Sequence, residues 1–115
     1  MATIFSDALT PARTGDWHFG GFLGRRIGTL TDARIRSDFA REKIHPETVE
    51  AFQNRIDDRM EEDSGYWQGE FWGKWILSAV ATCRYYGDDR LHSLIESSVH
   101  QILDTQDPNG YIGTY

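Results

Sequence analysis

The sequence predicts an all-α protein, built from αα-hairpins and preceded by an irregular N-terminal segment. Two amphipathic helical patterns fill the last part of the 115-residue chain, and a short glycine-containing connection joins them. Helices joined by so short a loop lie antiparallel as neighbours. The chain is 39% hydrophobic and 26% charged, which is typical of a globular domain, and its length predicts one domain or part of one.

Residues 1–30 contain the glycine-rich stretch FGGFLGRRIG at positions 19–28. No apolar strand precedes these glycines, so they do not fit a dinucleotide or P-loop fingerprint, which needs strand, turn and helix in order. We therefore expect an irregular N-terminal segment at 1–30, with a short extended piece at Phe19–Leu23. The helices of the domain are expected at 31–115.

Two shorter helices are predicted from Thr31 onward. Thr31 can cap the first of them. Pro46 suits the first turn of the second, where a missing N–H costs little. The apolar positions at helical spacing are Ile35, Phe39 and Ala40 in the first helix, and Val49, Phe52, Ile56 and Met60 in the second. The acidic run at 57–63 is interpreted as an exposed end.

The clearest patterns are two helices at 70–86 and 88–103. Gly87 stands where a left-handed C-cap is favoured, and Asp88 or Asp89 can cap the next helix. The turn DPNG follows at 107–110. The apolar stripe of the first helix is Phe71, Trp72, Trp75, Ile76, Ala79, Val80 and Cys83, and that of the second is Leu91, Leu94, Ile95, Val99, Ile102 and Leu103.

Both stripes are too wide for one hairpin to cover. Three of the four tryptophans lie at 67–75, and each aromatic side chain buries about 150–250 Å² when it is enclosed. We therefore expect Trp72 and Trp75 to be covered by the rest of a larger domain or by another copy of the chain. The 115-residue chain by itself is expected to be poorly folded, aggregated or assembled through these faces.

Charge and composition exclude several classes of function. The net charge of −6 argues against a nucleic-acid platform, and no apolar run reaches the roughly 20 residues of a membrane span. The first residues show no basic region followed by an apolar stretch, so we predict no secretory signal and a cytoplasmic location by default. A single cysteine excludes an intrachain disulfide.

Polar residues stand among the aromatics of GYWQGEFWGKW at 65–75. Glu70 and Lys74 are four residues apart, and one interpretation is a surface ion pair of about 0.3–0.5 kcal/mol. The other is a sugar site at the open start of this helix, because sugars bind through hydrogen bonds to such side chains and stack on aromatic rings. The candidates for its wall are Trp67, Gln68, Glu70 and Lys74.

The last helix carries a polar row of histidine and acidic residues. Histidine and carboxylate at this spacing could share a metal ion, but the row lies opposite the apolar stripe, so we interpret it as solvent-exposed. Cys83 falls inside an apolar stripe and is interpreted as a small buried hydrophobic residue. No catalytic signature is recognisable, and we assign no catalytic residue and no metal ligand. The row consists of Asp88, His92, Glu96, His100 and Asp104.

The ending QDPNGYIGTY forms an aromatic-rich loop directly after the last helix. Loops carry function more often than helix faces do. Tyr111 and Tyr115 either cap the core of the hairpin or point into a cleft, and both interpretations stay open.

Four stretches of the chain together resemble glycoside hydrolase family 127, the β-L-arabinofuranosidase type. They are GKW at 73–75, GDDRL at 87–91, TQDPNGYIGTY at 105–115 and, less specifically, GFLGRRI at 21–27. The resemblance implies the leading part of an (α/α)6 barrel, which β-sandwich domains follow. Twelve barrel helices of about 12 residues each do not fit into 115 residues.

The resemblance also implies a chemistry. Family members act on L-arabinofuranosides or related plant glycans with a zinc-bound cysteine nucleophile and a glutamate acid/base. Those residues belong to a later part of the family's domain, so it implies no cofactor in this chain and zinc only for the complete domain. The matching positions at the barrel's open end, as candidates for substrate binding, are Glu70, Lys74, Asn109, Gly110 and Tyr111.

Three functions therefore remain open for this chain. The first is the N-terminal segment of such a hydrolase, with a carbohydrate substrate and the remainder of the barrel as its partners. The second is a non-catalytic helical module for sugar binding or oligomerisation. The third is another α/α-barrel chemistry, such as an epimerase or a lyase, because that fold hosts several.

Overall fold

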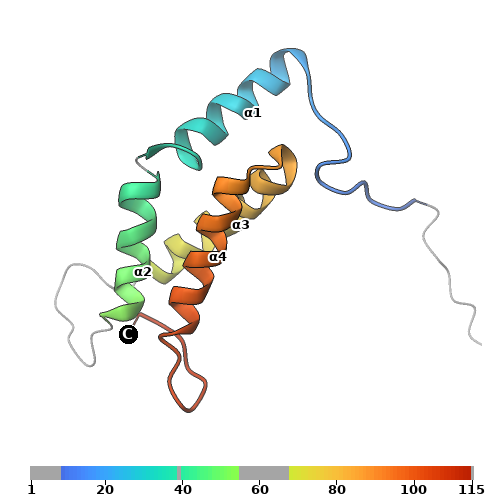
Figure 1. The fold of residues 1–115 in the computed structure, drawn as a ribbon. Helices are drawn as coiled ribbons and strands as arrows, with labels where there is room; N and C mark the ends of the chain where they lie inside the picture. The colour runs from blue at the N-terminus through green and yellow to red at the C-terminus, as the bar shows by residue number, and fades with distance from the viewer. Residues whose placement is uncertain (1–8, 39, 55–67, 115) are drawn as a thin grey trace, which may run out of the picture.

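The structure, a computed structural model, describes residues 9–38, 40–54 and 68–114. Within these residues it contains four α-helices and no strand, which confirms the all-α prediction. Figure 1 shows α3 and α4 side by side, α2 alongside them, and α1 across the end of the hairpin formed by α3 and α4. The elements are α1 (Gly21–Arg34), the π-helical turn η1 (Ala40–Ile44), α2 (His45–Gln53), α3 (Gln68–Tyr86) and α4 (Asp89–Leu103).

The predicted αα-hairpin is confirmed, with α3 beginning two residues earlier than expected. Gly87 has a φ of +65°, the left-handed conformation that favours glycine after a helix. The carboxylate of Asp88 accepts a hydrogen bond of 3.0 Å from the backbone N–H of Leu91, so Asp88 is the N-cap of α4. Two consecutive residues, Gly87 and Asp88, therefore fix the reversal of the chain.

Our prediction of irregular structure was wrong for residues 21–30, because α1 begins at Gly21. Thr31 is not a cap: it lies near the end of α1, and its hydroxyl donates to the backbone carbonyl of Ile27. Glycines lower helix propensity by about 1 kcal/mol each relative to alanine, which favoured the irregular interpretation. The helix is instead fixed by contacts at its two ends.

Those contacts come from the far end of α3 and from the turn after it. The backbone N–H of Phe19, just before α1, donates to the hydroxyl of Tyr85 at 2.8 Å. Arg36, just after α1, donates to Asp88. Gly24 lies so close to the carbonyl oxygen of Phe19 that a Cβ would collide with it. Tertiary contacts therefore override the weak local preference.

The prediction for Pro46 is confirmed, since it lies in the first turn of α2. Val49 and Phe52 are both buried, as expected from their spacing. The helix ends at Gln53. Phe39, Ile56, Met60 and the acidic run at 57–63 lie outside the described residues.

The first core cluster fills the space where the end of α1 meets the α3–α4 hairpin. Its buried members are Ile35, Trp75, Ala79 and Leu91, with Cys83 and other half-buried residues packed against them. Trp75 is only 5% exposed. Our expectation that Trp75 needs cover from outside the chain was therefore wrong, because Ile35 and α4 provide that cover.

The second core cluster joins α2 to the hairpin. Val49, Phe52 and Ile102 are buried there, and Trp72 and Ile112 pack against them. Trp72 is half-buried, and its indole N–H donates to the hydroxyl of Ser98 at 2.7 Å. Much of the cover for Trp72 thus also comes from this chain.

Replacement of Ser98 by alanine is expected to lower the free energy of unfolding by about 1 kcal/mol, because the Trp72 N–H loses its acceptor. Ser98 is fully buried, so the loss is not compensated fully by water. Urea denaturation of the variant measures the effect, with the exposed neighbour Ser97→Ala as the matched control. Equal stability of the two variants would contradict the role of this bond.

Several large apolar side chains of the described residues nevertheless remain exposed. Phe71 and Leu103 were predicted to lie on the buried stripes, but they are 52% and 50% exposed. Phe71 lies in the first turn of α3 and packs in neither core cluster. The other large apolar side chains exposed on α1 and α3 are Phe22, Leu23, Leu30, Leu77 and Tyr86. Among the helices described, none is long and apolar enough to cross a membrane.

Candidate functional site

The start of α3 carries the polar residues that the sequence analysis predicts as one wall of a sugar site. Glu70 and Lys74 form the expected i,i+4 ion pair, and both side chains are at least half exposed. The ammonium of Lys74 also lies 5.8 Å from the ring centroid of Phe71. Gln68 is half-buried, and Trp67 lies outside the described residues. The surface ion pair is thus confirmed, while a sugar site here stays a prediction.

The loop after α4 carries the other predicted binding residues, Asn109 and Tyr111. The side-chain oxygen of Asn109 accepts from the backbone N–H of Tyr111 at 2.9 Å, and the N–H of Gly110 donates to the carbonyl of Asp107 at 2.8 Å. Gly110 has a φ of +91°, so the predicted turn is confirmed. Asn109 therefore shapes the loop, while the Tyr111 side chain is 41% exposed. Tyr115 lies outside the described residues.

The two halves of this predicted site approach each other where Gly69 faces the side chain of Thr114. A Cβ on Gly69 would lie 3.4 Å from the ring of Phe52 and 3.6 Å from the methyl group of Thr114, which is buried. The C-terminal segment therefore passes the start of α3. The Glu70 and Lys74 side chains, however, bind each other rather than the loop.

The polar row on α4 is exposed to solvent, as predicted. His92 lies 3.5 Å from the carboxylate of Glu96, and both side chains are at least 60% exposed. Asp88 is the exception, because it serves as the N-cap. Among the described residues, no group of three or more histidine, cysteine or acidic side chains could hold a metal ion.

Cys83 is half-buried and packs against the first core cluster, close to the prediction of a small buried residue. Its thiol lies 3.5 Å from the carbonyl oxygen of Asp88. Burial raises the pKa of Cys83, and the negative charge of Asp88 raises it further. This setting opposes formation of the thiolate, so a nucleophilic role is disfavoured.

We therefore expect Cys83 in the folded protein to react several-fold more slowly with iodoacetamide at pH 8 than it does in 6 M urea. A raised pKa leaves less thiolate at that pH, and burial limits access. Mass spectrometry of the labelled chain measures the rate at this single cysteine. Equal rates in the folded and unfolded chain would show that the thiol is neither buried nor electrostatically restrained.

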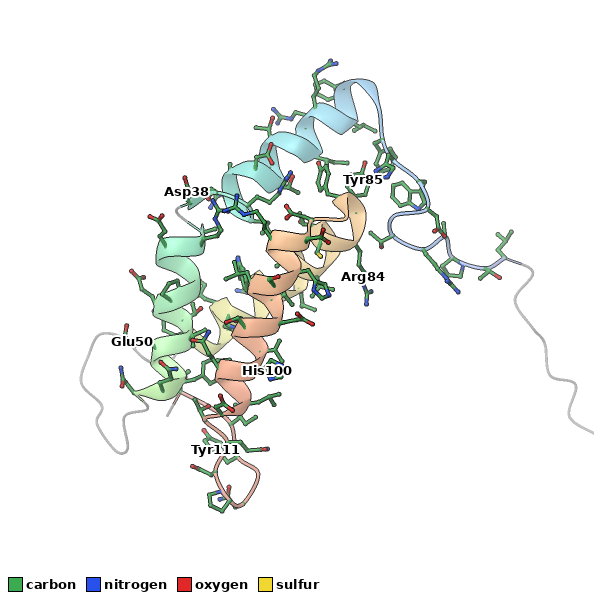
Figure 2. All side chains as sticks on the ribbon, viewed as in Figure 1. Asp38, Glu50, Arg84, Tyr85, His100 and Tyr111 are labelled. Carbon is green, nitrogen blue, oxygen red and sulfur yellow. The ribbon has the colours of Figure 1, made fainter. Side chains whose placement is uncertain are left out.

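The structure also contains a cavity that the sequence analysis missed. It has a volume of about 680 Å³ and lies where the end of α1 meets the turn between α3 and α4. The side chains around it include three arginines and three aspartates. In Figure 2 this end of the molecule, near the labelled Tyr85 and Asp38, is opposite the end that carries Tyr111. Its lining residues are Asp32, Arg36, Arg41, Tyr86, Gly87, Asp88, Asp89, Arg90 and Leu91.

Arg36 connects the helix ends that line the cavity. Its Nε donates to Asp88 at 2.8 Å and its Nη1 donates to Asp32 at 3.0 Å. Its guanidinium carbon also lies 5.1 Å from the centroid of the Tyr86 ring. One guanidinium thus ties the end of α1 to the end of α3 and the start of α4.

Asp88 has two roles, as a cap and as the partner of Arg36. The hydrogen bond from the backbone N–H of Leu91 lowers the pKa of Asp88, and the guanidinium of Arg36 lowers it further, against the opposing effect of burial. Its side chain is only 16% exposed. The carboxylate is therefore held ionised at neutral pH.

The sequence could reveal only half of this arrangement. Asp88 is recognisable as a helix cap, but its partner Arg36 is 52 residues away in the chain. Arg41 lies in no motif that would mark it, and Arg90 is marked only as part of the stretch GDDRL. The cavity follows from the packing of α1 on the hairpin, which the sequence did not predict.

In comparisons with known proteins, the chain matches no protein-family model, no curated protein and no solved structure. The family resemblance therefore rests on the four stretches quoted from the sequence, and the function is a matter for proposal.

Proposed function

We propose that this chain is the N-terminal segment of a glycoside hydrolase of the family 127 type, acting on L-arabinofuranosides or related plant glycans. The observation that carries the proposal is the α3–α4 hairpin, capped by Gly87 and Asp88 and followed by the Asn109 turn. The same residues form the stretches GDDRL and TQDPNGYIGTY, which resemble the family. Hairpins of this kind are the repeating unit of an (α/α)6 barrel.

Exposed apolar residues support a larger domain. Leu77 on the outer side of α3 is 74% exposed, and Phe71 and Leu103 are about half exposed. In a barrel, the next hairpin would cover such side chains. We propose that the remainder of the barrel covers them, with another copy of the chain as the alternative.

The described residues do not fit the zinc centre of this family. Cys83 packs against the core, and among the described residues it belongs to no group of three or more histidine, cysteine or acidic side chains that could hold a metal ion. The zinc and the catalytic residues would then be supplied by a later part of the domain. This chain is proposed to be catalytically incomplete by itself, and Glu70, Lys74 and Tyr111 are proposed to contribute to binding.

The test is hydrolysis of p-nitrophenyl β-L-arabinofuranoside, measured for the 115-residue chain and for the full product of its gene. We expect turnover by the full product and none by the chain. A full product that ends at Tyr115, or one that leaves this glycoside and related plant glycans intact, would overturn the proposal.

A non-catalytic sugar-binding or oligomerisation module is the second candidate. The observation that favours it is the burial of Trp75 by residues of this chain, which gives the chain a core of its own. Light scattering after size-exclusion chromatography measures the oligomeric state of the isolated chain and so distinguishes the two candidate functions. The hydrolase proposal predicts aggregates or assemblies of the isolated chain, whereas a cooperatively unfolding monomer would favour an autonomous module.

A further inference from the structure

We propose that the outer face of α1 binds the surface of an anionic lipid bilayer. In this arrangement α1 lies among the lipid headgroups, in the plane of the bilayer, and does not cross it. The inference goes beyond the proposed function and does not depend on it. The outer face of α1 consists of Phe22, Leu23, Arg26 and Leu30.

The first observation is that α1 contains no buried residue, although it carries four large apolar side chains. Phe22, Leu23 and Leu30 are 68%, 57% and 63% exposed. The other three α-helices of the described residues each bury apolar side chains in a core cluster. Apolar side chains concentrated on one exposed helix are typical of a contact surface.

The outer face points away from the rest of the molecule. Positions four and seven apart lie on one side of a helix, so the members of the outer face lie together. The opposite side of α1 faces α3, because the hydroxyl of Thr31 lies 3.5 Å from that of Tyr86, and a Cβ on Gly28 would lie 3.8 Å from the same atom. Figure 1 shows α1 along one edge of the molecule.

Charge indicates which kind of surface the outer face fits. Arg25, Arg26 and Arg34 are exposed, and among the described residues no carboxylate lies within ion-pair distance of them. The guanidinium of Arg26 lies 6.0 Å from the ring centroid of Phe22, so its stem can follow the apolar face while its charge reaches the headgroups. Anionic phospholipids offer both phosphates for the arginines and an acyl region for the apolar side chains.

The distribution of charge along the chain also favours binding through this end. Residues 9–34 contain four arginines and two aspartates, whereas the whole chain has a net charge of −6. The excess of negative charge therefore lies elsewhere in the chain. An anionic surface attracts the end that carries α1 and repels the remainder, which orients the molecule.

The segment before α1 adds two exposed aromatic rings at the same end of the helix. Trp17 and Phe19 are 42% and 45% exposed, and their ring centroids lie 4.7 Å apart. The backbone of Phe19 and the ring of Trp17 both contact Tyr85, which holds this segment in place. Tryptophan is enriched at the headgroup level of membranes, because its ring is apolar and its N–H can bond to water or lipid.

The way in which α1 is held favours a flat surface over the groove of an acidic protein. A groove that accepts an amphipathic helix encloses it on several sides. The bond from Phe19 to Tyr85 ties α1 to the hairpin before its first residue, and the bond from Arg36 to Asp88 does so after its last. The inner side of α1 is therefore occupied, and a bilayer needs only the outer one.

Vesicle flotation measures the binding of the full gene product to lipid. One set of vesicles contains phosphatidylcholine alone, and the other contains equal parts of phosphatidylcholine and phosphatidylglycerol. We expect binding only to the second set, and its loss in high salt, because salt screens the attraction between arginine and lipid.

Variants of the outer face should weaken this binding. Joint replacement by Arg25→Gln and Arg26→Gln is expected to lower the binding constant about fivefold for each charge removed. Joint replacement by Phe22→Ser and Leu23→Ser should lower it about tenfold or more, because apolar area is no longer buried in lipid. All four residues are exposed, so circular dichroism should show a folded protein.

Two variants outside α1 are the matched controls. Arg90→Gln removes an exposed arginine that, among the described residues, has no carboxylate within ion-pair distance. Leu9→Ser removes a leucine that is 85% exposed. Both should leave the binding constant within about twofold of the wild type.

Several results would overturn the inference. They are failure to bind either set of vesicles, equal binding to both sets, and losses in the control variants as large as those in the α1 variants. Resistance of Leu30→Cys to maleimide labelling without vesicles would also overturn it, because protein would then cover the outer face. None of these measurements depends on hydrolysis, so they leave the test of the proposed function separate.

Discussion

Replacement of Trp75 by alanine is expected to lower the free energy of unfolding by about 3–5 kcal/mol, which is the usual cost of removing a buried tryptophan. Trp75 is 5% exposed and lies between Ile35, Ala79 and Leu91, so the cavity left behind would open the first core cluster. This cluster also holds the end of α1 to the hairpin. We therefore expect the variant to lose part of its helix signal as well as its stability.

Circular dichroism during urea denaturation measures this loss. Leu77→Ala is the matched control, because Leu77 lies on the same helix and is 74% exposed. The control should change stability by no more than about 0.5 kcal/mol. Similar losses in the two variants would mean that Trp75 is not enclosed as described.

Replacement of Asp88 by alanine is expected to cost about 2 kcal/mol, the upper end of the range for an N-cap, because the Arg36 ion pair is lost with the cap. The Leu91 N–H would lose its acceptor, and Arg36 would keep only Asp32. Asp88→Asn is the matched variant: its side-chain oxygen can still cap α4, but it carries no charge for Arg36. It should cost about 1 kcal/mol or less.

The dependence on pH distinguishes the charge from the cap. The pKa of Asp88 is lower in the folded chain than in the unfolded chain, where it is about 3.9. Its ionised form therefore adds stability above about pH 4, and this contribution disappears as the pH falls through the lowered pKa. The stability difference between the wild type and Asp88→Asn should be largest near neutral pH and should shrink below about pH 4. A constant difference would exclude the ionised carboxylate as its source.

The α3–α4 hairpin was predictable because its signals are local. The apolar spacing, the glycine at Gly87 and the cap at Asp88 act within a few residues of the bond that each one makes. The turn at Asn109 and Gly110 was predictable for the same reason. Likewise, Glu70 and Lys74 pair because they are one helical turn apart.

Helix α1 was not predictable in this way. Its local sequence contains Gly21, Gly24 and Gly28, which disfavour a helix. The bonds that secure it reach Tyr85 and Asp88, which are 66 and 52 residues distant in the chain from their partners Phe19 and Arg36. No local pattern encodes such contacts.

The all-α class, the hairpin and its caps follow from local sequence alone, because helix periodicity and capping are properties of neighbouring residues. Tertiary packing is needed to cover Trp75 from within the chain, to form α1, and to bring Arg36 to Asp32, Asp88 and Tyr86 around a cavity. One cause accounts for all three. Burial and ion pairing depend on which distant segments fold against one another, and the short-range pattern of the chain does not specify that choice.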